Sequence, residues 1–337
     1  METLRTARGY AEAIGRFAAE PRVLLPFLRG GGTLLDEPRP PLPEGHVQEV
    51  AGHGQLFWRD TGPPPDPARA RGTILLLHGW MVPSDPHWFR TWRLLQVDGW
   101  RVIALDARGH GRGTRPMTPF RLDDCAEDAA ALVRHLDAGP VIAVGYSMGG
   151  AIAQILALRH PEILRGVVLC ATSSEFKSSP IMRAVWYSMS VFQLWLRLAP
   201  KWTWELFVEQ LAQGDPVTTA WVVGELRRGS PEDVAEAGRD IGRFDSRSWI
   251  GEVKIPAAVL VCTMDLLVPP TMQRALAERL DAPMVEIQSD HLAPATTPRR
   301  FHRGLGQALD LVAARDELAT RRRAARAAAP RRRRASP

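Results

Sequence analysis

The chain has 337 residues, of which 45% are hydrophobic and 24% are charged. This is the composition of a folded globular protein with one large or two smaller domains, and it excludes a disordered chain, a collagen-like fibre and a coiled coil. Three cysteines, none of them in a CxxC pair, exclude a disulfide framework and a cysteine-rich zinc site and indicate a reducing compartment.

The net charge of +6 comes mainly from one end of the chain. Eight of the 43 basic residues lie in 321–337, a segment without an acidic residue, so the rest of the chain is close to neutral. A nucleic-acid-binding fold would carry its basic residues on a folded face. We therefore expect no specific nucleic-acid partner and interpret residues 318–337 as an Ala/Arg-rich basic tail that is helical at first and disordered by its end. As an alternative, this tail could tether the protein to anionic surfaces.

Residues 1–44 are expected to form a helical extension that ends in a proline-rich connector at 38–43. No stretch has the continuous apolar core of a signal peptide or a transmembrane helix. The most apolar candidate, 140–158, is interrupted by glycine, serine and glutamine. The sequence therefore predicts no transmembrane segment and a cytoplasmic protein.

Residues 45–172 predict the first part of an α/β core. Two short strands over 47–50 and 55–59 open it, around Gly52 and Gly54. Continuous apolar runs then alternate with helical segments, which is typical of a parallel sheet covered on both faces. The predicted strands are 73–77, 101–105, 141–144 and 166–169, and the predicted helices are 88–97, 122–136 and 150–159.

The alternation stops near Thr172 and resumes near residue 251. Residues 173–250 contain helical stretches, no convincing buried strand and six of the eleven tryptophans, so we interpret them as a helical insertion. Residues 251–317 complete the core, with predicted strands at 257–261 and 284–287 and predicted helices at 271–280 and 298–311. The expected fold class is thus α/β, with a mostly parallel central sheet flanked by helices and an insertion after the sixth strand.

The strongest chemical signal is a G-x-S-x-G motif, Gly145-Tyr146-Ser147-Met148-Gly149, between a predicted strand and a predicted helix. A serine at such a sharp turn is lifted clear of the sheet, and glycines on both sides allow the backbone segments to pack closely. The helix that begins at Met148 points its N–H groups toward the place where an oxyanion would form. This context predicts Ser147 as a nucleophile.

Four further motifs occur in an order that resembles the capped members of the α/β-hydrolase fold superfamily, the esterase- and lipase-like serine hydrolases. The resemblance covers residues 45–315. It departs from the common pattern at Thr263 and Ser289, where many members have glycine. The matching segments are His78-Gly79-Trp80, Asp106-Ala107-Arg108-Gly109-His110-Gly111, the motif around Ser147, Cys262-Thr263-Met264-Asp265, and Asp290-His291.

The resemblance implies a Ser147–His291–Asp265 catalytic triad. His291 would take the serine proton, Asp265 would orient the imidazole, and the backbone N–H groups of Trp80 and Met148 would form the oxyanion hole. It further implies that 173–250 is a helical cap over the site, whose tryptophans pack the cap onto the core and suggest an apolar pocket. No metal or organic cofactor is implied.

Several alternatives stay open at this point. His302 is the rival base and Asp290 the rival acid. His78 and His110 are interpreted as residues that hold loops in place. The structural residues near the site are His78, Gly79, Gly145 and Gly149. The expected function is hydrolysis of a carboxylic ester with a small or medium apolar acyl group. The alternatives are a C–C bond hydrolase, a lactonase or a cofactor-free haloperoxidase-like enzyme on the same triad, or a non-catalytic binding protein on the same fold.

Overall fold

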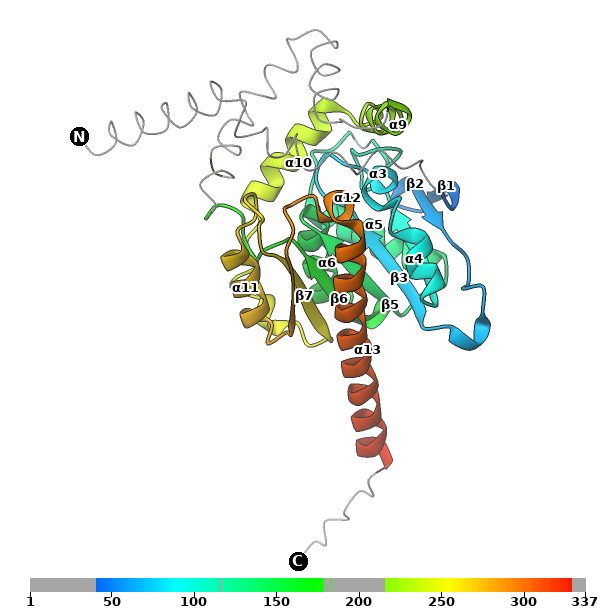
Figure 1. The fold of residues 1–337 in the computed structure, drawn as a ribbon, viewed down its shortest axis with the longest axis vertical. Coiled ribbons are helices and arrows are strands. Elements are labelled where there is room, and N and C mark those ends of the chain that lie inside the picture. The colour runs from blue at the N-terminus through cyan, green and yellow to red at the C-terminus, as the bar shows by residue number, and fades with distance from the viewer. Residues whose placement is uncertain (1–40, 116, 179–182, 184–215, 329–337) are drawn as a thin grey trace, which may run out of the picture.

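A computed structural model describes residues 41–115, 117–178, 183 and 216–328 (Figure 1). Its centre is an eight-stranded sheet in the order β1-β2-β4-β3-β5-β6-β7-β8. The β1–β2 and β2–β4 pairs are antiparallel, and all other pairs are parallel. The strands are β1 Glu44–Val50, β2 Gly54–Asp60, β3 Gly72–Leu77, β4 Trp100–Leu105, β5 Val141–Tyr146, β6 Leu164–Cys170, β7 Ala257–Cys262 and β8 Met284–Ile287. The mostly parallel sheet predicted from the apolar runs is confirmed.

The apolar strands are buried on both faces, and successive side chains belong to two different cores. In β3, for example, Ile74 and Leu76 join one core, whereas Leu75 and Leu77 join the other. Helices α4 and α13 cover the face of Ile74 and Leu76, and helices α5 and α6 cover the face of Leu75 and Leu77. This two-sided burial explains why the strands appear in the sequence as continuous apolar runs.

The helices and short 3₁₀ turns of the core follow the predicted alternation. They are η1 Pro67–Arg69, α3 Ser84–Trp88, α4 Trp92–Val97, α5 Leu122–His135, α6 Met148–Arg159, η2 Pro161–Ile163, η3 Ile250–Glu252, α11 Pro270–Arg279, α12 Ala293–Thr296 and α13 Pro298–Ala328.

The helix predicted over 88–97 is wrong, because the structure has two short helices there, α3 and α4. The Thr91 amide donates to the Trp88 carbonyl, three residues back, instead of to a carbonyl four residues back. This tight turn ends the first helix, and the chain restarts as α4 at Trp92. Trp88 and Trp92 are both buried, so the apolar periodicity continues through the break and hides it in the sequence.

Two helices of the predicted insertion are described, α9 Pro216–Leu226 and α10 Pro231–Arg243. Figure 1 shows both at the same end of the molecule as α3 and α12. They are bound to the core by side chains: Arg112 forms ion pairs with Asp85 of α3 and Glu225 of α9, and Asp240 of α10 accepts from the Leu122 amide at 2.8 Å. Of the six tryptophans of the insertion, Trp221 packs on Phe89 and Trp249 on Phe244; the other four lie outside the described residues.

The last helix is far longer than predicted. The sequence favoured a helix ending near Leu311 and, from 318, a tail that is helical at first and then disordered. Instead, α13 runs as one helix to Ala328 and extends away from the body of the molecule (Figure 1). Alanine and arginine are strong helix formers, and no glycine or proline follows Gly306 until Pro330. The predictions for residues 1–40 and 329–337 lie outside the described residues. Within the described helices, none is long and apolar enough to cross a membrane.

Candidate active site

Ser147 lies in the sharp turn between β5 and α6. Its backbone has φ 53° and ψ −113°, a region that residues with a side chain adopt only at a cost in free energy. Hydrogen bonds hold the turn from two sides. The Ser147 amide donates to the Cys170 carbonyl at 2.9 Å, and the Ser147 carbonyl accepts from the Thr172 hydroxyl at 2.8 Å.

The two glycines of the motif are required by close backbone contacts. A Cβ on Gly145 would lie 2.3 Å from the Gly149 carbonyl oxygen, and a Cβ on Gly149 would lie 2.1 Å from the Leu77 carbonyl oxygen. No side chain fits at such distances, so the G-x-S-x-G pattern predicts this strand-to-helix turn for a steric reason.

His291 lies directly beside the serine, with Nε2 3.0 Å from Ser147 Oγ. The residue follows β8, and its carbonyl accepts a hydrogen bond from the Tyr146 hydroxyl at 2.9 Å. Tyr146 therefore links the strand that carries the serine to the loop that carries the histidine. The sequence analysis gave Tyr146 no such role, because a tyrosine inside an apolar strand gives no sign of its partner.

Asp265 completes the line of hydrogen bonds. Its Oδ2 lies 2.7 Å from His291 Nδ1, and its side chain has no exposed surface. Its Oδ1 accepts from the backbone amides of Leu267 and Val268, each at 2.9 Å. The two oxygens thus have separate tasks: one is fixed by the backbone, and the other faces the imidazole.

Gln273 is a buried residue of this site that the sequence analysis missed. From α11, its Nε2 donates to Asp265 Oδ2 at 3.1 Å and to the Val268 carbonyl at 2.7 Å, while its Oε1 accepts from the Cys262 amide at 2.9 Å. Gln273 thereby joins the carboxylate to the end of β7. A lone glutamine among the inward-facing residues of α11 is the signal that could have found it.

The loop after β3 lies against the serine turn. A Cβ built on Gly79 would be 3.7 Å from Ser147 Cβ, so the backbone that leads to Trp80 passes beside Ser147. Met148 is the first residue of α6, where helical geometry leaves the backbone N–H without a partner inside the helix. This arrangement is compatible with the expected oxyanion hole of Trp80 and Met148 N–H groups.

His78 fixes the loop that carries Trp80. Its Nδ1 donates to the Gly79 carbonyl at 2.8 Å, and its Nε2 accepts from the Ala107 amide at 2.9 Å. Burial lowers the pKa of His78, in agreement with an imidazole that uses one nitrogen as donor and the other as acceptor. His78 thus holds two loops together, the role expected for it.

The Trp80 side chain joins the loop to the insertion. Its indole Nε1 donates to the Val234 carbonyl of α10 at 2.7 Å, and its ring packs against Val234 and its buried neighbours Val223, Leu226 and Ala235. The sequence analysis predicted only a backbone role for Trp80. The contact with α10 depends on the position of the insertion over the core, which the local sequence does not specify.

The two rival residues, His302 and Asp290, make contacts elsewhere. His302 is on α13, with Nε2 3.1 Å from Asp98. Asp290 accepts from the Leu292 amide at 2.9 Å and from the Thr296 hydroxyl at 2.8 Å, so it closes the turn that contains His291. Neither contact involves Ser147 or the His291 imidazole.

His110 is a buried histidine of the Asp106–Gly111 loop. Its Nδ1 donates to the Arg108 carbonyl at 3.1 Å, and its Nε2 has no partner among the described residues. Burial, the neighbouring His78 and Arg115 lower its pKa to about 3. In the folded protein His110 is therefore neutral at every pH above that value.

This buried imidazole predicts a loss of stability in acid. Below pH 6.5 the unfolded chain binds a proton at residue 110 that the folded chain rejects, so the free energy of unfolding falls between pH 6.5 and about 3. For His110 alone the loss between pH 7 and pH 5 is about 2 kcal/mol. Urea titrations at pH 7 and pH 5 measure the free energy of unfolding of wild type and His110→Asn. The difference between the two pH values should be about 2 kcal/mol smaller in His110→Asn than in the wild type. His135→Asn, at an exposed position of α5, is the control. An equal pH difference in wild type and His110→Asn would contradict the prediction.

The three cysteines are free and buried, as expected for core residues. Burial raises the pKa of the Cys170 thiol well above its ordinary value and that of Cys262 as well, so neither is a ready thiolate. Among the described residues, no three His, Cys, Asp or Glu side chains gather so that they could hold a metal ion.

Comparisons with known sequences agree with this geometry. Residues 72–213 match the alpha/beta hydrolase fold family. A 3-oxoadipate enol-lactonase of Acinetobacter baylyi is 25% identical over 209 residues, covering 61% of this chain and 77% of its own. A non-heme chloroperoxidase of Streptomyces lividans is 35% identical over 115 residues, covering 34% of this chain and 40% of its own.

Solved structures share the whole architecture. The enol-lactonase of Burkholderia xenovorans has a TM-score of 0.65 at 22% identity and covers 79% of this chain and 100% of its own. A thermophilic esterase of Thermogutta terrifontis has a TM-score of 0.62 at 24% identity and covers 80% of this chain and 99% of its own. At these identities the similarity establishes the fold. Together with the family match over 72–213, it shows that the chain has the α/β-hydrolase fold.

Proposed function

We propose that the protein is a serine hydrolase that cleaves carboxylic esters through an acyl-enzyme at Ser147. The observation that carries this proposal is the continuous line from Ser147 Oγ to His291 Nε2, at 3.0 Å, and from His291 Nδ1 to Asp265 Oδ2, at 2.7 Å. The order Ser147, Asp265, His291 along the chain is the order of this fold. A binding protein on the same fold would have no need of an intact, buried triad.

Acylation follows from this geometry. Ser147 Oγ attacks the ester carbonyl as its proton passes to His291 Nε2, and the negative charge that develops on the carbonyl oxygen is stabilised by the N–H groups of Met148 and Trp80. The tetrahedral intermediate then collapses: the bond to the alcohol oxygen breaks, and His291 gives its proton to that oxygen. Asp265 stabilises the imidazolium throughout.

Deacylation repeats the same steps with water. His291 takes a proton from the water, whose oxygen attacks the acyl carbonyl, and the second intermediate releases the acid and returns the proton to Ser147. The strained backbone of Ser147 and the backbone-held Asp265 oxygen keep the reacting groups in place, so little reorganisation is needed at either step.

The finer assignment is a small or medium apolar acyl group bound beneath a cap made from residues 173–250. The described helices α9 and α10 support this proposal, because Val223, Leu226, Val234 and Ala235 form an apolar cluster against the Trp80 loop. The nearest alternative is a lactone, an internal ester that the same triad would open. Relatives named as an enol-lactonase and a chloroperoxidase make lactone cleavage and peroxide chemistry the competing activities to test.

A fluorophosphonate probe and a substrate panel test the proposal together. The probe should add one adduct to the wild-type mass, located at Ser147 by peptide mapping, because only a serine activated by a base reacts readily. The panel should comprise p-nitrophenyl esters of increasing acyl length, a γ-lactone, and halide oxidation with peroxide. Turnover of the esters above the lactone supports the finer assignment. An unlabelled protein without turnover on any substrate would contradict the proposed function.

A further inference from the structure

A second histidine, His87, lies beside the proposed catalytic serine and belongs to neither the triad nor the oxyanion hole. It is on α3, eight residues after Gly79. A Cβ built on Gly79 would lie 3.3 Å from His87 Cε1, 3.7 Å from His87 Nδ1 and 3.7 Å from Ser147 Cβ. One edge of the His87 ring and the Ser147 side chain therefore lie beside the same position of Gly79, the position at which a larger residue would carry its Cβ.

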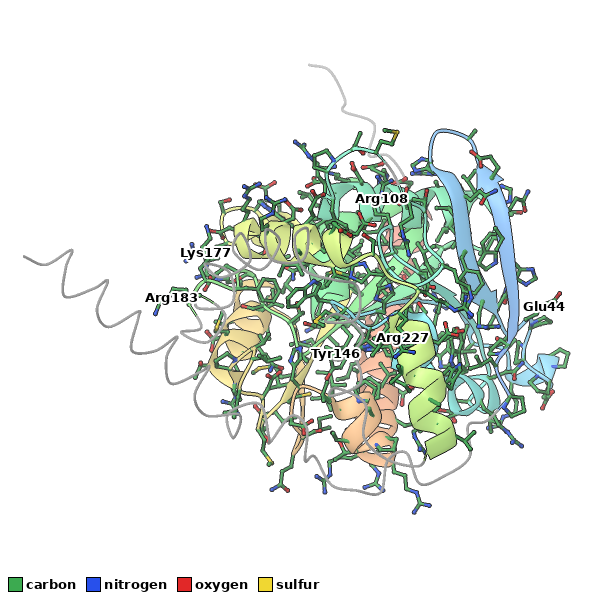
Figure 2. All side chains as sticks on the ribbon, turned by 90° about the horizontal axis from the view of Figure 1, so that it is seen from above. Glu44, Arg108, Tyr146, Lys177, Arg183 and Arg227 are labelled. Atoms are coloured by element: carbon green, nitrogen blue, oxygen red, sulfur yellow. The ribbon has the colours of Figure 1, made fainter. Side chains whose placement is uncertain are left out.

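The ring is held rigidly by aromatic neighbours. Its centroid lies 4.3 Å from the ring of Trp88 and 4.9 Å from that of Tyr146, both in edge-to-face arrangements. Tyr146 is the residue before the serine, and it lies near the centre of the view in Figure 2. Packing thus fixes the orientation of His87 relative to Ser147.

No hydrogen bond within the described part of the chain uses either nitrogen of His87. Nε2 is buried without a partner, whereas the residue as a whole is partly exposed. Buried polar groups without a partner are rare and ask for an explanation. The other histidines of this region, His78 and His110, both bond backbone groups.

The ring is also uncharged. Burial, together with the neighbouring His78 and His291, holds the pKa of His87 well below its ordinary value. A neutral imidazole has one donor and one acceptor nitrogen, and it offers no positive charge to a carboxylate. Its natural partner is a neutral polar group, above all a hydroxyl. A hydroxyl can donate to an imidazole nitrogen that lacks a proton and accept from one that carries a proton, so it suits either tautomer.

We propose that His87 is a specificity-determining residue that hydrogen-bonds a neutral polar group of the substrate, such as a hydroxyl, a few atoms from the scissile carbonyl. The inference rests on the proposed function, because Ser147 defines where the carbonyl lies. It narrows the substrate class from plain acyl esters to esters with a neutral hydroxyl or keto substituent near the ester bond.

The test compares paired substrates in wild type and His87→Phe, which keeps an aromatic ring against Trp88 and Tyr146 but removes both nitrogens. The acyl-side pair is p-nitrophenyl 3-hydroxybutyrate and p-nitrophenyl butyrate. The alcohol-side pair is 2-hydroxyethyl butyrate and ethyl butyrate, and their hydrolysis is measured by the release of butyric acid. For each pair the readout is the ratio of kcat/KM for the hydroxylated ester to kcat/KM for the plain ester. Any general damage to the catalytic groups cancels in this ratio.

We expect one of the two ratios to fall about tenfold in His87→Phe, as for the loss of one hydrogen bond, and the affected pair identifies the side of the ester that His87 contacts. His87→Gln, which keeps a donor and an acceptor, should restore part of the ratio. If the phenylalanine variant does not fold, His87→Leu, which also lacks both nitrogens, is measured in its place. Unchanged ratios for both pairs in a folded variant would overturn the proposal. Absence of Ser147-dependent hydrolysis of plain butyrate esters by the wild type would instead refute the proposed function, so the two failures are distinguishable.

Discussion

Ser147→Ala is expected to lower kcat for ester hydrolysis by about 10⁴- to 10⁶-fold, the range found when a serine nucleophile is removed from such a triad. The hydroxyl oxygen that lies 3.0 Å from His291 Nε2 is lost, so no acyl-enzyme can form. Substrate binding should change little, because the oxyanion donors are backbone groups. Pre-steady-state kinetics with a p-nitrophenyl ester in excess over enzyme measure this directly, since the burst of p-nitrophenol should disappear.

Two comparisons make this result specific. Far-UV circular dichroism and thermal unfolding should match the wild type, because alanine can occupy the same backbone position with φ 53° and the hydrogen bonds of the turn are made by backbone atoms of residue 147. Ser248→Ala, at an exposed serine, is the matched control and should retain full activity. A folded Ser147→Ala protein with a burst of normal amplitude would show that the nucleophile lies elsewhere.

Asp265→Asn should lower kcat by about 10⁴-fold with little change in KM, and the structure gives the reason. Oδ1 of residue 265 accepts from the Leu267 and Val268 amides, so the asparagine carbonyl must take that position. Its NH₂ group would then face His291 Nδ1. Because an NH₂ group only donates, Nδ1 would have to accept a hydrogen bond instead of donating one. The proton of the imidazole would move to Nε2, and the base would lose its capacity to take a proton from Ser147.

Asp290→Asn is the control for this prediction. The asparagine oxygen can still accept from the Leu292 amide and the Thr296 hydroxyl, so the turn that holds His291 should persist and activity should stay near the wild-type level. The two variants remove the same charge from neighbouring segments of the site, and only one of them changes the tautomer of the base. Activity within tenfold of wild type in Asp265→Asn would contradict the assigned orienting role.

The order of elements and the positions of the catalytic candidates could be predicted because they depend on local patterns. Continuous apolar runs mark strands buried on both faces. The glycines at 145 and 149 mark a turn whose backbone leaves no room for a side chain. Serine, aspartate and histidine at the ends of parallel strands come together because those ends meet at one edge of the sheet. The break between α3 and α4 could not be predicted in this way, because the apolar pattern continues through it. The full length of α13 could not be predicted either, because the end of this helix is supported by helix propensity alone and has no pattern of buried apolar residues.

What supports the triad was decided by the tertiary structure. Gln273 reaches Asp265 from a helix eight residues further along the chain, Tyr146 bonds the backbone of a loop that follows three strands later, and Trp80 bonds α10 of the insertion. His87 faces Ser147 only because α3 folds back over Gly79. Each of these contacts joins different elements of the fold, and a polar side chain within an apolar element does not indicate its partner. The sequence by itself indicated which groups we propose for the chemistry, and the packing of the elements determined which groups hold them in place.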